Sequence, residues 1–242
     1  MAGAEALPTR PLFVVLDGVD GCGKTTQATR LAARLGALRG AGHPAPLHLR
    51  EPGSTAAGER LRALVLDPDV PLGDGTLALL FVAARREMLQ RLVAPALAEG
   101  RDVVVERFHP STFAYQGEAA RRRAGGEPAG SDGLDRDGAT YDDEALLALL
   151  RGWAGAPAPT VEIVLDLPGD VAFERALARD GGGVDRFESR GPGFQRDVAA
   201  AMRDYVRRVP TADAVDATGS EDEVAERILA CVVAHAREAA RV

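Results

Sequence analysis

The sequence predicts an α/β fold in which helices cover both faces of a parallel β-sheet. Short apolar runs, each long enough for one buried strand, alternate with amphipathic stretches at helical spacing along most of the 242 residues. The first apolar run also leads straight into a glycine-rich turn and then a helix, which places that turn at an edge of the sheet. The length favours one domain with an insertion over two domains.

The elements are expected in the following order along the chain. Five strands are expected, at 12–17, 47–50, 102–106, 161–166 and 213–216. Helices are expected at 24–39, 76–94, 170–179 and 194–208, and a last helix should open at the capping box Ser220-x-x-Glu223. Pro95 should kink or restart the second of these helices because it lacks a backbone N–H.

One stretch breaks the alternation of strands and helices. Residues 118–142 are rich in glycine, charge and small polar side chains, so they have little to bury. We expect a mobile surface insertion there. We interpret its run Arg121–Arg123 as a solvated charge cluster; the alternative is that these arginines bind phosphate.

The composition is that of an ordinary globular protein, with 46% hydrophobic and 27% charged residues. A formal net charge of −7 argues against nucleic-acid binding, which usually needs a net basic face. Two cysteines are too few for a disulfide framework or a zinc site, and no apolar run is long enough to cross a bilayer. With no signal peptide recognisable at the start, we expect a cytoplasmic protein.

The glycine-rich turn, residues 18–25, fits the phosphate-binding pattern G-x-x-x-x-G-K-[ST] and is called the P-loop below. Lys24 is the only lysine among 29 basic residues, and its compact charge suits the β- and γ-phosphates of ATP. The Thr25 hydroxyl suits Mg²⁺. The predicted nucleotide-binding residues are Gly18, Val19, Asp20, Gly21, Cys22, Gly23, Lys24, Thr25 and Thr26.

Beyond the P-loop, the chain resembles the thymidylate kinase family along nearly its whole length. The motifs that carry the resemblance are LFVVLDGVDGCGKTTQ, REPGST at 50–55, LFVAAR at 80–85, ERF at 106–108 with AYQG at 114–117, and DRFE at 185–188. The resemblance implies that residues 1–242 form a single P-loop nucleoside monophosphate kinase domain. It also implies transfer of the γ-phosphoryl of ATP to dTMP, with Mg²⁺, in a homodimer built through the helix near 76–94.

The resemblance assigns a second group of residues to the monophosphate. Phe81 and Arg85 are four apart and share a helix face, so the ring can stack on a pyrimidine while the guanidinium donates to it. The alternative is core packing for Phe81 and a surface charge for Arg85. Thr112 corresponds to a family residue at the base edge, although helix capping explains it equally well. Tyr115 corresponds to one beside the sugar 2′ position, and Gln116 follows it in the same motif.

Charged residues near the expected strand ends are expected to bind phosphate or the metal ion. Arg107 follows a buried strand, where open sheets bind ligands, and the resemblance gives it the acceptor phosphate, with Arg50 as a second. A plain salt bridge is the alternative for Arg107. Glu106 stands where the family has a metal-holding aspartate, and Thr25 and Glu106 are the expected metal ligands. Asp20 is a further catalytic carboxylate, whereas Asp17 is expected to be structural.

Arginines around Gly181–Gly183 predict a lid over residues 179–193. Some members of the family carry an arginine in the P-loop, but the corresponding residue here is Gly21, so the lid has to supply the catalytic charge, from Arg179 or Arg186. Plain solvated charge is the alternative for these arginines. Two other functions stay open: a kinase for another pyrimidine monophosphate, and a nucleotide-binding regulatory protein without turnover.

Overall fold

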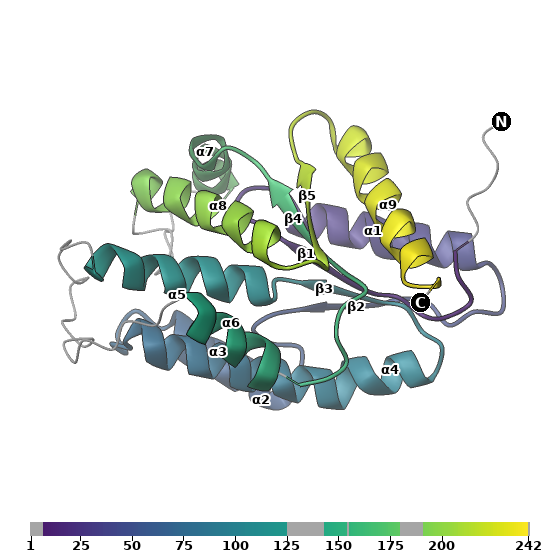
Figure 1. Cartoon of the computed structure of the whole chain (residues 1–242), viewed down its shortest axis with the longest axis horizontal. Helices are drawn as coiled ribbons and strands as arrows, with labels where there is room; N and C mark the ends of the chain where they lie inside the picture. The colour runs from purple at the N-terminus through teal and green to yellow at the C-terminus, as the bar shows by residue number, and fades with distance from the viewer. Residues whose placement is uncertain (1–6, 125–142, 154, 180–190, 242) are drawn as a thin grey trace.

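The computed structural model describes residues 7–124, 143–153, 155–179 and 191–241, with only the backbone described for 118–124 and for 179. Helices lie on both faces of a central sheet (Figure 1). The strands are β1 (Phe13–Asp17), β2 (Leu47–Arg50), β3 (Val103–Glu106), β4 (Val161–Asp166) and β5 (Ala212–Asp216). They pair in the order β2-β3-β1-β4-β5, all parallel, which confirms the predicted five-stranded sheet.

The strand register brings three strand ends together. Leu16 of β1 and Arg50 of β2 both lie beside Glu106 of β3. The turns that follow these strands therefore meet at one edge of the sheet, the carboxyl edge, where open parallel sheets bind ligands.

Two apolar clusters sandwich the sheet, because successive side chains of a strand point to opposite faces. Val14 and Leu16 of β1 pack toward α1 (Lys24–Arg39) and α9 (Glu221–Glu238). Phe13 and Val15 pack on the other face, toward the end of α3 (Asp74–Met88), a π-helical turn at Leu89–Val93, and α4 (Ala94–Ala98). The remaining helices are α2 (Ala56–Leu66), α5 (His109–Ala124), α6 (Asp143–Trp153), α7 (Gly169–Arg179) and α8 (Gly191–Arg208).

The predicted helix at 76–94 begins two residues earlier and continues through the π turn into α4. Pro95 lies in the first turn of α4, where its missing N–H costs no hydrogen bond, and the wider turn just before it makes room for the ring. The helix thus changes to π-helical geometry before Pro95 and continues, instead of ending and restarting, while α1 and the capping box of Ser220 and Glu223 that opens α9 are confirmed.

Three helices were not predicted: α2, α5 and α6. Helix α5 extends to Ala124, so the first seven residues of the predicted insertion at 118–142 are helical backbone; residues 125–142 lie outside the described part of the chain. Helix α8 begins at Gly191, three residues before its predicted start. Among the described residues, no helix combines the length and the apolar character that a membrane span requires.

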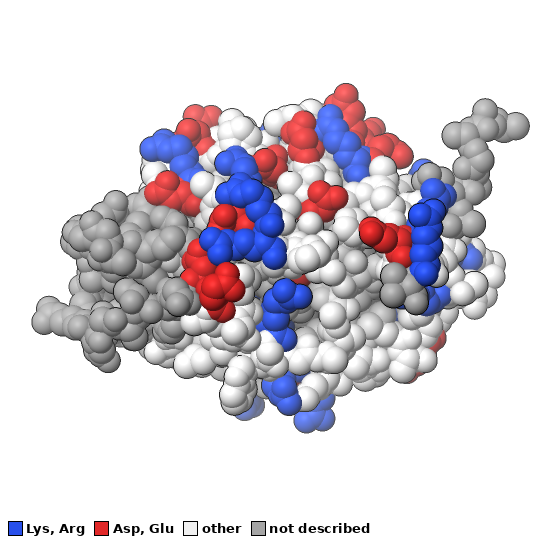
Figure 2. Space-filling model, in the orientation of Figure 1, with Lys and Arg blue, Asp and Glu red and all other residues white. Residues whose placement is uncertain are grey.

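Charges of both signs are interspersed on the face drawn in Figure 2. Arginines of α8 take part in several of the surface ion pairs, such as Arg203 with Asp166 and Arg208 with Asp204. Exposed pairs of this kind contribute little to stability.

Candidate functional site

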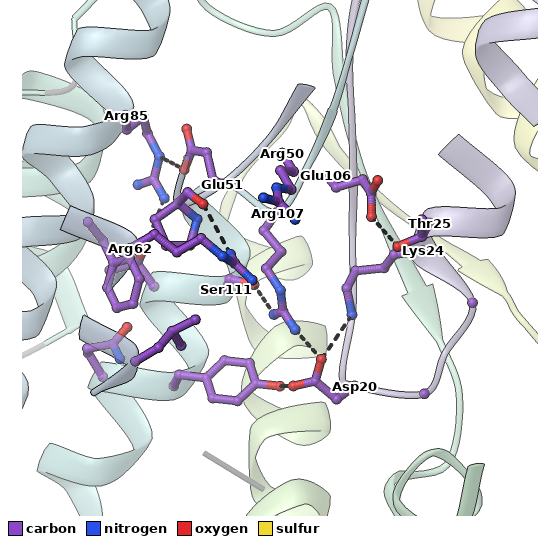
Figure 3. A pocket seen from close by; sticks show the side chains of 18 of the residues that line it. Asp20, Lys24, Thr25, Arg50, Glu51, Arg62, Arg85, Glu106, Arg107 and Ser111 are labelled. Carbon is purple, nitrogen blue, oxygen red and sulfur yellow. Dashed lines mark hydrogen bonds and ion pairs between the residues drawn. The ribbon is translucent and has the colours of Figure 1, made fainter. Parts of the chain in front are cut away.

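A cleft of about 740 Å³ opens at the carboxyl edge of the sheet. Its walls come from the P-loop, the turn after β2, helices α2, α3, α5 and α7, and the end of β3. Figure 3 shows the side chains from these elements pointing toward one another across it. The cleft thus joins segments that lie far apart in the sequence.

The P-loop is held close to α7. Gly21 has φ 83°, and a Cβ at this position would lie 2.0 Å from the Ala172 carbonyl oxygen and 3.0 Å from the Ala176 nitrogen. A side chain at position 21 therefore runs into the backbone of α7. The contact and the positive φ both favour glycine at this position.

Lys24 is buried within the P-loop. Its Nζ donates to the carbonyl oxygens of Gly18 at 3.0 Å and Val19 at 2.9 Å, and lies 3.7 Å from Asp20 Oδ1. The ammonium thereby crosses the loop and holds its two ends together. It is also at the wall of the cleft, within reach of a phosphate bound there.

The nine predicted nucleotide-binding residues divide into two groups. The residues that line the cleft are Asp20, Gly21, Gly23, Lys24, Thr25 and Thr26. Gly18, Val19 and Cys22 do not line it, and the side chains of Val19 and Cys22 are buried in the core below the loop. These three shape the loop from underneath.

Glu106 lies directly beside the P-loop. The Thr25 hydroxyl donates to Glu106 Oε2 at 2.6 Å, and His48 Nε2 is 2.8 Å from Glu106 Oε1 (Figure 3 shows the bond from Thr25). Glu106 is one methylene longer than the aspartate that the resemblance leads us to expect here. Its side chain reaches Thr25, and each of its two carboxylate oxygens is held by one neighbour. The sequence reading missed His48, because its place beside Glu106 depends on the pairing of β2 with β3.

Arg107 and Asp20 form an ion pair on the floor of the cleft. Arg107 has φ 64°, a strained value for an arginine, and its other terminal nitrogen donates to Ser111 Oγ at 3.0 Å. Asp20 also accepts a hydrogen bond from the Tyr115 hydroxyl at 3.1 Å. Burial opposes ionisation of Asp20, but the charges of Arg107 and Lys24 outweigh it and hold the pKa of Asp20 well below its usual range. The salt bridge that was the alternative for Arg107 is therefore present, but it lies in the cleft, and binding of the acceptor phosphate stays a prediction.

Asp17 is structural, as expected. Its carboxylate accepts hydrogen bonds from the backbone N–H groups of Gly18, Phe108 and Ser111, at 2.8 to 2.9 Å, and from the Ser111 hydroxyl at 2.6 Å. This fully buried acid therefore ties the end of β1 to the first turn of α5. It fixes Arg107, which lies one residue before Phe108.

Arg85 is buried rather than a surface charge, because only 1% of it is exposed. Its Nε donates to Glu51 Oε2 at 2.8 Å, its Nη2 donates to Thr112 Oγ1 at 3.1 Å, and the guanidinium lies over the Phe108 ring. Burial raises the pKa of Glu51 to about 7, even though the Arg85 charge lowers it. Thr112 is thus explained by its bond to Arg85.

Three buried polar atoms at this end of the cleft have no hydrogen-bond partner among the described residues. They are Arg85 Nη1, Glu51 Oε1 and Gln116 Nε2. Two donors and one acceptor left unpaired beside a cleft are costly unless water or a polar ligand satisfies them. A pyrimidine, with carbonyl oxygens and an N–H on one edge, offers both kinds of partner.

One aromatic and three basic side chains also lie at the cleft wall. Phe81 of α3 is half-buried there, and Arg50 is exposed, 3.5 Å from Glu59. Arg62 and Arg175 also line the cleft and were not among the predicted site residues.

The structure describes only part of the predicted lid over 179–193. The described part comprises the backbone of Arg179 at the end of α7 and residues 191–193 in α8. The side chain of Arg179 and all of Arg186 lie outside the described residues.

The side chains at the P-loop fit a nucleotide with Mg²⁺. Thr25 and Glu106 offer only oxygen donors, which Mg²⁺ prefers, and the glycines let the backbone approach phosphate closely. The described residues therefore contain a glycine-rich loop with its lysine, an oxygen-donor pair and a group of unpaired polar atoms around one cleft.

Comparison with known proteins agrees with this geometry. The family model described as thymidylate kinase matches residues 16–124. The chain is 40% identical over 221 residues to a thymidylate kinase of Jannaschia sp. (strain CCS1), covering 90% of this chain and 94% of the relative. It is likewise 40% identical over 222 residues to a thymidylate kinase of Dinoroseobacter shibae, with 90% and 94% covered. The crystal structure of thymidylate kinase from Ehrlichia chaffeensis aligns with a TM-score of 0.63 at 22% identity, over 91% of this chain and 97% of that one, which supports the fold.

Proposed function

Because the chain belongs to the thymidylate kinase family, we propose that its cleft transfers the γ-phosphoryl group of ATP to dTMP and releases dTDP and ADP. The observation that carries the proposal is the juxtaposition of two half-sites in one cleft. Lys24 and Thr25 of the P-loop lie at one end, and Arg85 with unpaired polar atoms lies at the other. A donor and an acceptor nucleotide bound there point their phosphates at each other.

The P-loop holds the donor. Its backbone N–H groups and the first turn of α1 present partial positive charge to the phosphates of ATP. Lys24 exchanges its bonds to the Gly18 and Val19 carbonyls for the β- and γ-phosphate oxygens. Thr25 and Glu106 hold Mg²⁺, which neutralises phosphate charge when it is bound. His48 keeps the Glu106 carboxylate turned toward Thr25.

Arg107 and Arg85 hold the acceptor. Arg107 is fixed by Asp20 and Ser111 at the floor of the cleft, where its fork meets the monophosphate. The unpaired Nη1 of Arg85 donates to a base carbonyl, and Phe81 stacks on the ring. No protein nucleophile is required, because phosphoryl transfer depends on positioning and on neutralising charge.

The lid supplies charge to the transferred phosphoryl. Gly21 leaves the P-loop without an arginine, and the contact with α7 leaves no space for one. We assign the catalytic charge to Arg179 rather than Arg186, which has Asp185 as its neighbour. Arg175, one turn before Arg179 on α7, already lines the cleft and supports approach from this side. Single-turnover rates of Arg179→Ala and Arg186→Ala distinguish the two arginines. Loss of the catalytic charge should slow the chemical step and leave the ATP dissociation constant nearly unchanged.

Product analysis tests the proposed reaction. Purified protein with ATP, Mg²⁺ and dTMP should form dTDP and ADP in equal amounts, and no ADP above background without dTMP. Lys24→Ala is the matched control and should abolish both products while keeping the fold, measured by thermal unfolding. ADP release that does not depend on a monophosphate, or no release at all, rules the proposed reaction out.

We also propose that the enzyme works in the cytoplasm as a homodimer built through α3 and the π turn. Leu79 of α3 is 57% exposed and is the large apolar side chain of this helix that such an interface would cover. Light scattering of the wild type and of Leu79→Glu tests it. The wild type should have twice the mass of the chain and the variant should dissociate, whereas a monomeric wild type contradicts the proposal.

A further inference from the structure

A second group of metal-binding side chains lies between β5 and α9. The Asp213 carboxylate, the Cys231 thiol and the His235 imidazole each offer one ligand atom, and the three atoms lie within 4.8 Å of one another. Asp213 is on β5, an edge strand of the sheet, while Cys231 and His235 are four apart on α9. None of the three lines the cleft, so the proposed reaction makes no use of them.

From this geometry we propose that Asp213, Cys231 and His235 form a zinc site that fastens α9 to the edge of the sheet, contrary to the expectation that two cysteines are too few for one. Asp213 Oδ2 lies 3.6 Å from Cys231 Sγ and 3.4 Å from His235 Nε2. Zinc bonds of about 2.0–2.3 Å at tetrahedral angles separate S–O and N–O ligand pairs by about 3.3–3.6 Å. The two separations from Asp213 Oδ2 therefore match edges of a zinc tetrahedron, and the Cys231–His235 pair lies within 4.8 Å.

The donor set selects zinc over the Mg²⁺ of the cleft. Thiolate and imidazole are ligands of zinc and related transition metals, whereas Mg²⁺ prefers oxygen. Residues four apart on a helix share one face, which is why Cys231 and His235 converge on Asp213. Three protein ligands leave the fourth position to water.

Zinc binding changes the protonation of Cys231. Cys231 is a free cysteine, and an ordinary thiol is protonated at neutral pH. On binding, the S–H bond breaks, a Zn–S bond forms and the proton passes to the buffer. One proton released for each zinc bound is the signature of this thiol as a ligand.

Zinc titration of the full chain tests the site, with a chromophoric chelator as competitor and no nucleotide or Mg²⁺ present. The wild type should bind one zinc. Cys231→Ser and His235→Gln should each weaken it by at least about tenfold. His43→Gln, which changes an exposed histidine elsewhere, is the matched control and should bind like the wild type. Zinc uptake that is absent from the wild type, or equal in all four proteins, overturns the proposal.

Two further measurements identify the ligands and the effect on the fold. Co²⁺ in place of zinc should give a thiolate-to-metal charge-transfer band that Cys231→Ser removes, although Cys22 is still present; a band that survives this substitution contradicts the proposal. Zinc at about one hundred times its dissociation constant should raise the Tm by roughly 5–10 °C in the wild type and not in Cys231→Ser. A shift of equal size in both proteins places the metal elsewhere.

Discussion

Gly21→Ala tests whether the fit between the P-loop and α7 is needed for phosphoryl transfer. The added Cβ would lie 2.0 Å from the Ala172 carbonyl oxygen, whereas ordinary contacts begin at 3.4 Å. Both partners of this clash are backbone segments, so the loop or the helix has to move by more than an ångström. A misplacement of that size costs about 100-fold in rate when it affects groups that hold the reacting atoms.

Backbone strain has to be separated from this displacement. Gly21 has φ 83°, and any other residue there carries a conformational penalty of about 1–3 kcal/mol. Gly100→Ala is the matched control, since Gly100 has φ 75° and nothing lies within 4 Å of its added Cβ. Both variants should carry the strain penalty and Gly21→Ala the cost of the clash in addition, while only Gly21→Ala should lose turnover.

The assay is the single-turnover rate of dTDP formation with saturating ATP and dTMP, together with thermal unfolding of each variant. We expect Gly21→Ala to be about 100-fold slower than the wild type and Gly100→Ala to be close to it. If the two variants turn over within about threefold of each other, the contact with α7 does not position the P-loop, and the reasoning fails.

Four further predictions concern single side chains of the cleft. Lys24→Arg should cut turnover at least about 100-fold, because the larger fork misplaces charge against the phosphates; near-normal turnover would remove the P-loop from catalysis. Phe81→Ala should raise the KM for dTMP by about 5- to 150-fold and leave that for ATP nearly unchanged, since stacking on a base contributes roughly 1–3 kcal/mol; equal effects on both constants indicate a folding defect. His48→Ala frees one oxygen of Glu106 and should raise the Mg²⁺ concentration for half-maximal rate by about tenfold, which an unchanged Mg²⁺ titration contradicts. Burial raises the pKa of Glu51 from 4.5 to about 7, so ionisation of Glu51 should lower the free energy of unfolding of the wild type by up to roughly 3 kcal/mol as the pH rises from 4.5 to about 7. Thermal unfolding of Glu51→Gln over the same pH range should not show this loss.

Local pattern was sufficient to predict the sheet and the P-loop. The run at 161–166 is apolar over the length of one strand, and the glycines and Lys24 lie within a few residues of one another. Such signals depend on neighbours in the sequence. Helix α5 escaped prediction because its first turn contains Pro110 and its later part is rich in charge, features also found in loops.

Contacts between distant segments could not be read from the pattern. The burial of Arg85 follows from Glu51, 34 residues away, and the position of His48 beside Glu106 follows from the pairing of two strands. Arg62 and Arg175 reach the cleft from helices whose packing decides which face points inward. Sequence motifs identified site residues in the P-loop, in the strand-end turns and on helices α3 and α5, while the supporting partners of these residues required the fold.

The most direct test of the proposed function is kcat/KM for a panel of nucleoside monophosphates with ATP and Mg²⁺. The panel comprises dTMP, dUMP, dCMP, UMP, CMP, AMP and GMP. The pocket of Phe81, Arg85 and Gln116 predicts the highest kcat/KM for dTMP, with purines and ribonucleotides far below it. A higher value for any other monophosphate, or turnover with none of them, contradicts the proposal.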